Sequence, residues 1–151
     1  MSKLQQFVES FPWLRNETTP FAQLGKDLAQ CTIALISTGG LYVKGDRPFA
    51  IANREDVDES YRVIPRGTAL EELAIGHEHY DKRHCSEDLN VIFPIERLER
   101  LADEGFIGRV AEANYSISGY IPRPDQLFET GRRIARSLEY EGVDAVILVP
   151  V

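Results

Sequence analysis

Two apolar runs, one in the first third of the chain and one at its end, constrain its fold more than any other feature. Residues 32–36 (Thr-Ile-Ala-Leu-Ile) and residues 143–149 (Val-Asp-Ala-Val-Ile-Leu-Val) are rich in β-branched and aliphatic side chains. Runs of this kind, with little polar alternation, are typical of buried strands in a parallel sheet. In open α/β sheets, ligands bind at the carboxyl ends of such strands. We therefore expect the residues that follow the two runs to share one crevice.

Helical patterns separate the expected strands. Thr19 and Pro20 form a good helix start, with a hydroxyl cap followed by proline. The expected elements are helices over residues 19–28, 94–105 and 124–141, a helical turn over 68–73, and strands over 61–65 and 117–121. This alternation predicts an α/β fold, a three-layer αβα arrangement with a mainly parallel, Rossmann-like sheet. Residues 31–151 are expected to form the α/β domain, and residues 1–30 an N-terminal helical segment.

Composition narrows the class of protein. The 151 residues are 43% hydrophobic, which is enough for one real core, and the formal net charge is −7. Basic residues are dispersed among more numerous acidic ones, which argues against a nucleic-acid partner. The apolar runs are far shorter than the roughly 20 residues that span a bilayer, and the N-terminus lacks the apolar stretch of a signal peptide. A cytoplasmic protein without a membrane partner is expected, with Cys31 and Cys85 as reduced thiols.

A Ser/Thr/Gly turn directly follows the first apolar run. Glycine allows backbone N–H groups to approach an anion such as a carboxylate. The turn lacks the spacing of a dinucleotide-binding motif or a P-loop, so a tight exit from a strand explains it equally well. The candidate substrate-binding residues are Ser37, Thr38, Gly39, Gly40 and Tyr42.

The three histidines of the chain lie in one short segment, residues 77–84. If this segment is extended, His77, His79 and Asp81 project to the same face. Such a set suits a proton relay, and with His84 it offers an alternative metal site. The spacing matches no closed structural zinc site, and hydrogen bonds from these side chains to loop backbone are an equally good explanation.

Several segments, in order, resemble the selenoprotein B family. They are Leu35-Ile-Ser-Thr-Gly-Gly-Leu-Tyr42, Asp46-Arg-Pro-Phe49, Ser60-Tyr-Arg-Val-Ile-Pro65, His77-Glu-His-Tyr-Asp81, Asp88-Leu-Asn-Val-Ile-Phe-Pro-Ile-Glu-Arg-Leu98, Glu104-Gly-Phe-Ile-Gly108 and Gly142-Val-Asp-Ala-Val-Ile-Leu-Val-Pro-Val151. The family includes substrate-specific subunits of glycine, sarcosine and betaine reductases, together with the selenoprotein subunit of D-proline reductase. The chain looks most similar to the short branch that contains D-proline reductase.

The resemblance implies reductive cleavage of the C–N bond of an amino acid or related amine. In the family a selenolate attacks the carbon that bears the amino group, which is often held on a pyruvoyl group of a partner subunit. A nearby thiol then forms a selenenyl sulfide, which a dithiol donor reduces. The resemblance also implies that selenocysteine or cysteine follows Val151. We therefore expect that the chain stops just before its nucleophile, either at a UGA codon read as a stop or because the sequence was cut at that point.

Within this hypothesis, His77, His79 and Asp81 form the acid/base or positioning set, and residues 37–40 contact the substrate carboxylate. No cofactor is expected within the residues of this chain itself, and a homo-oligomer is expected. Two alternatives belong to other classes. One is a non-catalytic module that binds a small carboxylate or a metal, and the other is a thiol-dependent racemase-like or lyase-like enzyme that uses Cys85.

Overall fold

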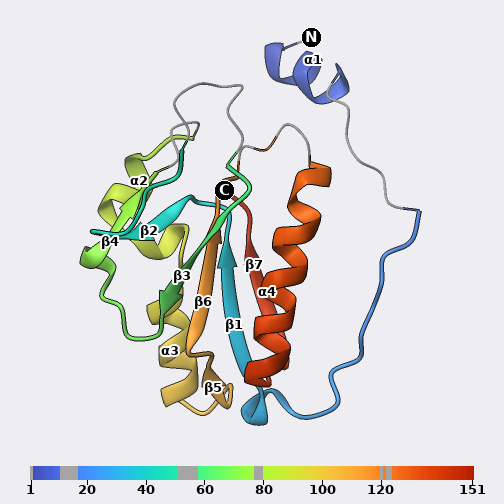
Figure 1. Ribbon diagram of the computed structural model, residues 1–151, viewed down its shortest axis with the longest axis vertical. Coiled ribbons are helices and arrows are strands. Elements are labelled where there is room, and N and C mark those ends of the chain that lie inside the picture. Colours follow the sequence, from blue (N-terminus) through green and yellow to red (C-terminus); the bar gives the residue numbers. More distant parts are fainter. Residues whose placement is uncertain (1, 11–16, 51–57, 77–79, 120, 122–123) are drawn as a thin grey trace.

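The computed structural model describes residues 2–10, 17–50, 58–76, 80–119, 121 and 124–151. Its centre is β1 (Thr32–Ser37), which pairs in parallel with β5 (Arg109–Val110), β6 (Ala113–Ile117) and β7 (Ala145–Val149) (Figure 1). Ile33 faces both Val110 and Ala145, so β5 and β7 lie on opposite edges of β1. β6 continues the edge occupied by β5, and β3 (Tyr61–Pro65) pairs with β6 in the antiparallel direction. The predicted α/β class and mainly parallel sheet are confirmed, while the three-layer Rossmann-like arrangement stays a prediction.

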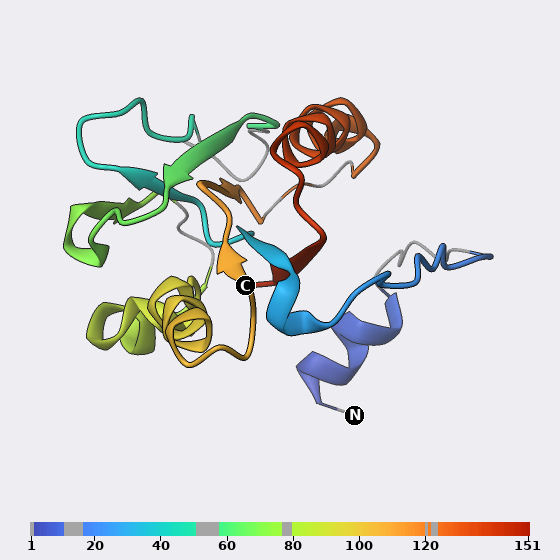
Figure 2. The same cartoon turned by 90° about the horizontal axis from the view of Figure 1, so that it is seen from below.

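The two faces of β1 contribute to two different apolar clusters, because successive side chains of a strand point to opposite faces. Ala34 packs with Ile134 and Leu138 of α4 (Leu127–Glu141). Ile33 and Leu35 belong to the larger cluster, which includes Phe93 and side chains of α3 (Ile95–Asp103). Figure 2 shows α4 on one side of the sheet, and α3 with α2 (Arg83–Glu87) on the other. The sheet is therefore covered by helix on both faces around β1.

A small second sheet extends the larger cluster. In it, β2 (Leu41–Val43) pairs in the antiparallel direction with β4 (Leu73–Ile75). The 3₁₀ turn η2 (Leu70–Glu72) directly precedes β4. Two other 3₁₀ turns precede helices: η3 (Leu89–Val91) lies between α2 and α3, and η4 (Pro124–Gln126) leads into α4. Leu41 and Leu73 are buried in the larger cluster. The antiparallel pair of β2 and β4 therefore enlarges the apolar cluster on the side of the sheet that carries α3.

The predicted helices at 94–105 and 124–141 and the strand at 61–65 are confirmed. Gly142 ends α4 in the left-handed conformation with a φ of 75°, as expected of a C-terminal glycine. The strand predicted at 117–121 was placed too late, since β6 covers Ala113–Ile117. The predicted strand at 143–149 exists as β7, but it is not buried: Leu148 is 70% exposed. Among the described residues β7 pairs only with β1, so it forms an edge.

The helix predicted over residues 19–28 is wrong. Residues 17–27 have no regular secondary structure, and Phe21 is 90% exposed. A short helix is only marginally stable unless its apolar face packs against another part of the protein. The favourable cap at Thr19 and the apolar spacing are therefore not sufficient to form a helix here. The N-terminal helix of the structure is instead α1 (Lys3–Ser10), and η1 (Leu28–Gln30) leads into β1. Within the described ranges, no helix is long and apolar enough to cross a membrane.

Candidate functional site

The carboxyl ends of three parallel strands meet at the turn that follows β1. The backbone N–H of Thr38 donates to the carbonyl of Val149 (3.0 Å), and the N–H of Val151 donates to the Thr38 hydroxyl oxygen (2.8 Å). On the other side, the N–H of Gly40 donates to the carbonyl of Ile117 at the end of β6 (3.0 Å). The predicted convergence of the first and last strands is therefore confirmed, and Thr38 is the residue that joins them.

The turn itself is tightly bonded. The buried Ser37 hydroxyl donates to the carbonyl of Ile92 (2.7 Å) and accepts from the N–H of Gly39 (3.0 Å). The N–H groups of Thr38, Gly39 and Gly40 thus all have acceptors inside the protein. An anion at this turn would have to use other donors. The Thr38 hydroxyl is one of them, because it accepts from Val151 and keeps its own hydrogen for donation.

Two further hydroxyl groups lie beside the turn. Ser118 pairs with Gly39 in an antiparallel bridge, is 1% exposed, and has no hydrogen-bond partner for its oxygen among the described residues. The Tyr80 hydroxyl donates to the carbonyl of Gly39 (3.1 Å). Burial, and secondarily the neighbouring Cys85 thiol, raises the pKa of Tyr80, so it stays a neutral donor. The sequence analysis did not single out Ser118 or Tyr80 as site residues.

The histidine segment is only partly described. His77 and His79 lie outside the described residues, so their predicted roles stay predictions. Asp81 is exposed and forms a two-point ion pair with Arg83, whose hydrogen bonds hold the pKa of that carboxyl below its ordinary value. Asp81 is therefore ionised at neutral pH and can accept a proton but not donate one. His84 is exposed on α2, and Tyr42 is partly buried on β2 opposite Ala74.

Cys85 is poorly placed for the thiol-enzyme alternative. Its side chain is 4% exposed, and its sulfur donates to the carbonyl of Lys82 (3.2 Å). Reactive thiols are accessible and lie in electropositive surroundings. Across the described ranges, no group of three or more histidine, cysteine or acidic side chains is arranged to hold a metal ion.

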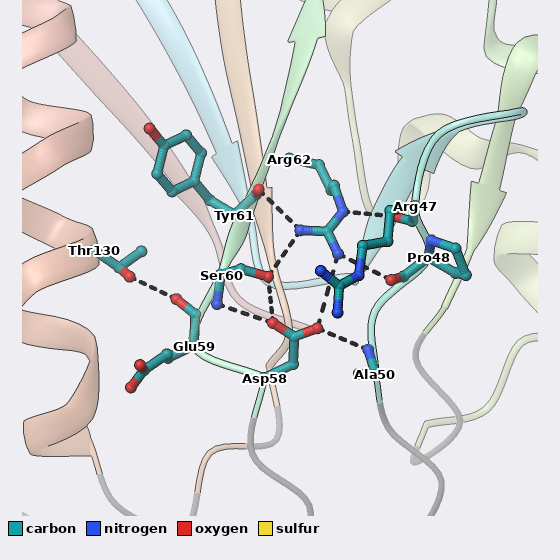
Figure 3. Close-up of polar contacts among 9 residues, drawn as sticks. All are labelled: Arg47, Pro48, Ala50, Asp58, Glu59, Ser60, Tyr61, Arg62 and Thr130. Carbon is teal, nitrogen blue, oxygen red and sulfur yellow. Dashed lines mark hydrogen bonds and ion pairs between the residues drawn. The ribbon is translucent and has the colours of Figure 1, made fainter.

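A second polar constellation lies at the same edge of the sheet, at the start of β3. Since β3 is antiparallel to β6, its first residue, Tyr61, pairs with Ile117 at the end of β6. Arg62 donates to the backbone carbonyls of Arg47 (2.7 Å) and Pro48 (3.0 Å), as Figure 3 shows. Its guanidinium also lies 4.2 Å from the centroid of the Phe49 ring. Arg62 therefore fixes the path of residues 47–49 over the sheet.

Asp58 completes this network. Its carboxylate accepts from the N–H groups of Ala50 (2.7 Å) and Ser60 (3.0 Å) and lies 3.8 Å from the Arg62 guanidinium. Burial alone would raise the pKa of Asp58, but the hydrogen bonds from Ser60 and Ala50, with the positive charge of Arg62, bring it below its ordinary value. The ionised Asp58 carboxylate therefore connects the backbone at Ala50 to the backbone at Ser60.

A cavity of about 510 Å³ opens beside this network, and we call it the Arg47 cavity. Its lining residues are Arg47, Ala50, Asp58, Glu59, Ser60, Arg62 and Gln126. Gln126, the residue that precedes α4, lines it, and the Thr130 hydroxyl in the first turn of α4 donates to the carbonyl of the lining residue Glu59 (2.5 Å). The sequence analysis assigned no site role to these residues, although Asp46-Arg-Pro-Phe49 and Ser60-Tyr-Arg62 were among the segments that carried the resemblance.

Because the pKa of Asp58 is lowered in the folded protein, the contribution of Asp58 to the free energy of unfolding is lost as the pH falls. A carboxyl group whose pKa is lowered by folding stabilises the protein above its unfolded pKa, here 3.8, and loses that effect as the pH falls through the folded value. We expect Asp58→Asn to lower the free energy of unfolding, and to lower it more at pH 7 than at pH 3. Urea unfolding of both proteins at the two pH values measures this, and an equal difference at both would contradict it.

Comparison with known proteins identifies the class. The family model described as glycine/sarcosine/betaine reductase selenoprotein B matches residues 2–151. The chain belongs to this selenoprotein B family, as the sequence analysis expected.

Individual relatives from reductase complexes also match the chain. The chain is 38% identical, over 82% of its length, to D-proline reductase subunit gamma of Acetoanaerobium sticklandii. It is 30% identical over 95% of its length to betaine reductase complex component B subunit beta of Peptoclostridium acidaminophilum. Identity to glycine reductase complex component B subunit gamma of Carboxydothermus hydrogenoformans is 26% over 97%. The matches cover 50%, 33% and 34% of these relatives, respectively. No solved structure matches the chain.

Proposed function

We propose that this chain forms part of a subunit of an amino-acid reductase complex that cleaves the C–N bond of proline or a related amine. Family membership and the 38% identity to a D-proline reductase subunit support this. The relatives are named as subunits or components of complexes, which supports a partner subunit here. In balanced form, the C–N bond takes up two electrons and two protons to give C–H and N–H, and a dithiol donor becomes a disulfide.

One observation carries the proposal: the two hydrogen bonds by which Thr38 holds the segment from Val149 to Val151. From the family pattern, we propose that the next residue of the polypeptide is selenocysteine or cysteine. Its place would then be the carboxyl edge of the sheet, where α/β proteins bind ligands. A selenocysteine there would supply a selenolate nucleophile for the reductive cleavage. A pyruvoyl group that holds the substrate amine is proposed for the partner subunit.

The residues around this position suit an anionic nucleophile. The hydroxyls of Thr38 and Ser118 are neutral hydrogen-bond donors, and Ser118 has no partner among the described residues. Hydrogen bonds to a charged form lower its pKa and keep it ionised. We propose that His77 and His79 move protons to and from the reacting nitrogen and carbon, and that the ionised Asp81 positions them or accepts a proton.

The direct test starts from the codon that follows Val151. We expect UGA, followed by an in-frame continuation that contains cysteine. The protein expressed from the complete reading frame with its partner subunit should then oxidise a dithiol in the presence of D-proline, glycine, sarcosine or betaine. A UAA or UAG codon, with no amine-dependent dithiol oxidation, would overturn the proposal and favour a non-catalytic binding module.

Thr38→Val tests the role of the Thr38 hydroxyl. Valine keeps the shape of the side chain but leaves the Val151 N–H without its acceptor. We expect turnover by the full-length protein to fall at least about tenfold, whereas the free energy of unfolding should fall by only about 1 kcal/mol. Thr68→Val is the matched control, because the Thr68 hydroxyl donates to the carbonyl of Pro65 (2.8 Å) beyond the other end of β3. Equal turnover in both variants would remove Thr38 from the site.

A further inference from the structure

We propose that the Arg47 cavity binds an amino acid as its zwitterion, through contacts made by this chain alone. The inference rests on the proposed function for the choice of amino acid, and on the charges of the cavity for the zwitterionic form. The cavity, at about 510 Å³, has a volume that is usual for small-molecule sites. The described residues that line it include two arginines and two carboxylates, whose formal charges balance.

Arg47 is placed to hold the carboxylate of the ligand. Its guanidinium is exposed at the cavity and has no ion-pair partner among the residues that the structure describes. Its backbone is fixed by the hydrogen bond from Arg62, and Figure 3 shows its side chain extending over the Asp58–Arg62 pair. A guanidinium can donate two parallel hydrogen bonds to a carboxylate.

The ammonium group of the ligand has acceptors among the other residues that line the cavity. The side-chain oxygen of Gln126 is shielded from solvent and has no hydrogen-bond partner among the described residues. Glu59 also lines the cavity, and its backbone is fixed by Thr130. Asp58 and Arg62 neutralise each other at the floor, which leaves Arg47 for one end of the ligand, and Gln126 and Glu59 for the other. A buried polar atom without a partner is costly, so occupation by a donor such as ammonium is favoured.

The Arg47 cavity is distinct from the position held by Thr38. It lies beside β3, and the strands β6 and β1 separate β3 from β7. Three strand spacings at about 4.8 Å correspond to about 14 Å. Both places are at the same edge of the sheet, so the cavity is an additional amino-acid site and does not depend on the nucleophile for binding.

Calorimetric titration of the protein expressed from its complete reading frame tests the inference with three matched probes. D-proline carries both charges, pyrrolidine carries only the ammonium, and tetrahydrofuran-2-carboxylate carries only the carboxylate. We expect D-proline to bind at least about tenfold more tightly than either analogue. Arg47→Ala should weaken D-proline binding at least about tenfold, and Arg47→Lys should weaken it less. Arg132→Ala, an exposed substitution on α4, should leave it unchanged.

Several outcomes would overturn the inference. These are equal affinity of Arg47→Ala and the unchanged protein for D-proline, equal affinity of either singly charged analogue, or no binding of D-proline at all. Unfolding midpoints of the variants show whether each remains folded. Turnover is measured separately: Arg47-dependent binding without any reductase activity would reject only the proposed function, and activity without Arg47-dependent binding would reject only the cavity.

Discussion

Replacing Phe93 with alanine is expected to lower the free energy of unfolding by about 3–5 kcal/mol. Phe93 is 0% exposed and packs in the larger apolar cluster with Leu35 of β1. Removal of the ring loses the transfer free energy of its buried surface and leaves a cavity that a close-packed core fills only in part. Since domains of this size are stable by only about 5–15 kcal/mol, the variant should unfold at a much lower urea concentration.

Phe106→Ala provides the matched control for Phe93. Phe106 is 64% exposed, just beyond α3, so the same chemical change removes little buried surface. We expect it to change the free energy of unfolding by less than about 0.5 kcal/mol. If the two alanine variants unfolded at the same urea concentration, Phe93 would not have the central position in the core that the structure gives it.

Gly119→Ala should have the second large effect, because it acts on the Thr38 turn directly. A Cβ at this position would lie 2.7 Å from the Thr38 carbonyl oxygen and 3.1 Å from its hydroxyl oxygen. The first of these contacts is with backbone, so the turn itself must shift. We expect a loss of about 1–3 kcal/mol in the free energy of unfolding. Under the proposed reductase function, turnover by the full-length protein should fall by at least about tenfold, because a displaced Thr38 no longer holds Val151. Each tenfold loss corresponds to about 1.4 kcal/mol in the barrier.

Gly131→Ala shows whether the effect at Gly119 comes from the contact with Thr38. Gly131 lies inside α4, and a Cβ there would meet no heavy atom within 4 Å apart from its chain neighbours and the backbone of its own helix. Alanine favours helix, so this variant should be more stable by about 0.5–1 kcal/mol and should keep its turnover. Urea unfolding and turnover are measured on both variants. A Gly119→Ala protein that matched Gly131→Ala in both would contradict the geometry of the turn.

Elements with strong local signals could be predicted from the sequence. β1 is a continuous apolar run, and α4 has apolar spacing together with a glycine that ends it. β6 was misplaced because its buried residues Asn114 and Ser116 are polar. Their side chains accept hydrogen bonds from the N–H groups of Leu35 (2.9 Å) and Leu41 (2.8 Å), so their burial depends on partners far away in the sequence. A strand whose buried side chains are polar has no periodic pattern of apolar residues by which the sequence could reveal it.

Only the part of the candidate site that has a local sequence signal could be predicted. A turn after a strand is visible locally, so residues 37–40 were found. The Arg47 cavity depends on the antiparallel direction of β3, which brings Arg62 against residues 47–49 at the carboxyl edge. Strand direction and register are set by tertiary packing, and neither can be deduced from the composition of residues 61–65. The contacts of Tyr80 and Ser118 with Gly39 were hidden for the same reason.

The turn after β1 is shared by three strands, and this has an evolutionary consequence. Thr38 binds the end of β7, Gly40 binds the end of β6, and Gly119 must stay small to admit the Thr38 carbonyl. Residues that share partners have effects that do not add, so one change alters the cost of the next. We therefore expect relatives to retain these three positions together or to replace them together. A lineage that altered only one of them would have to cross a poorly functioning intermediate.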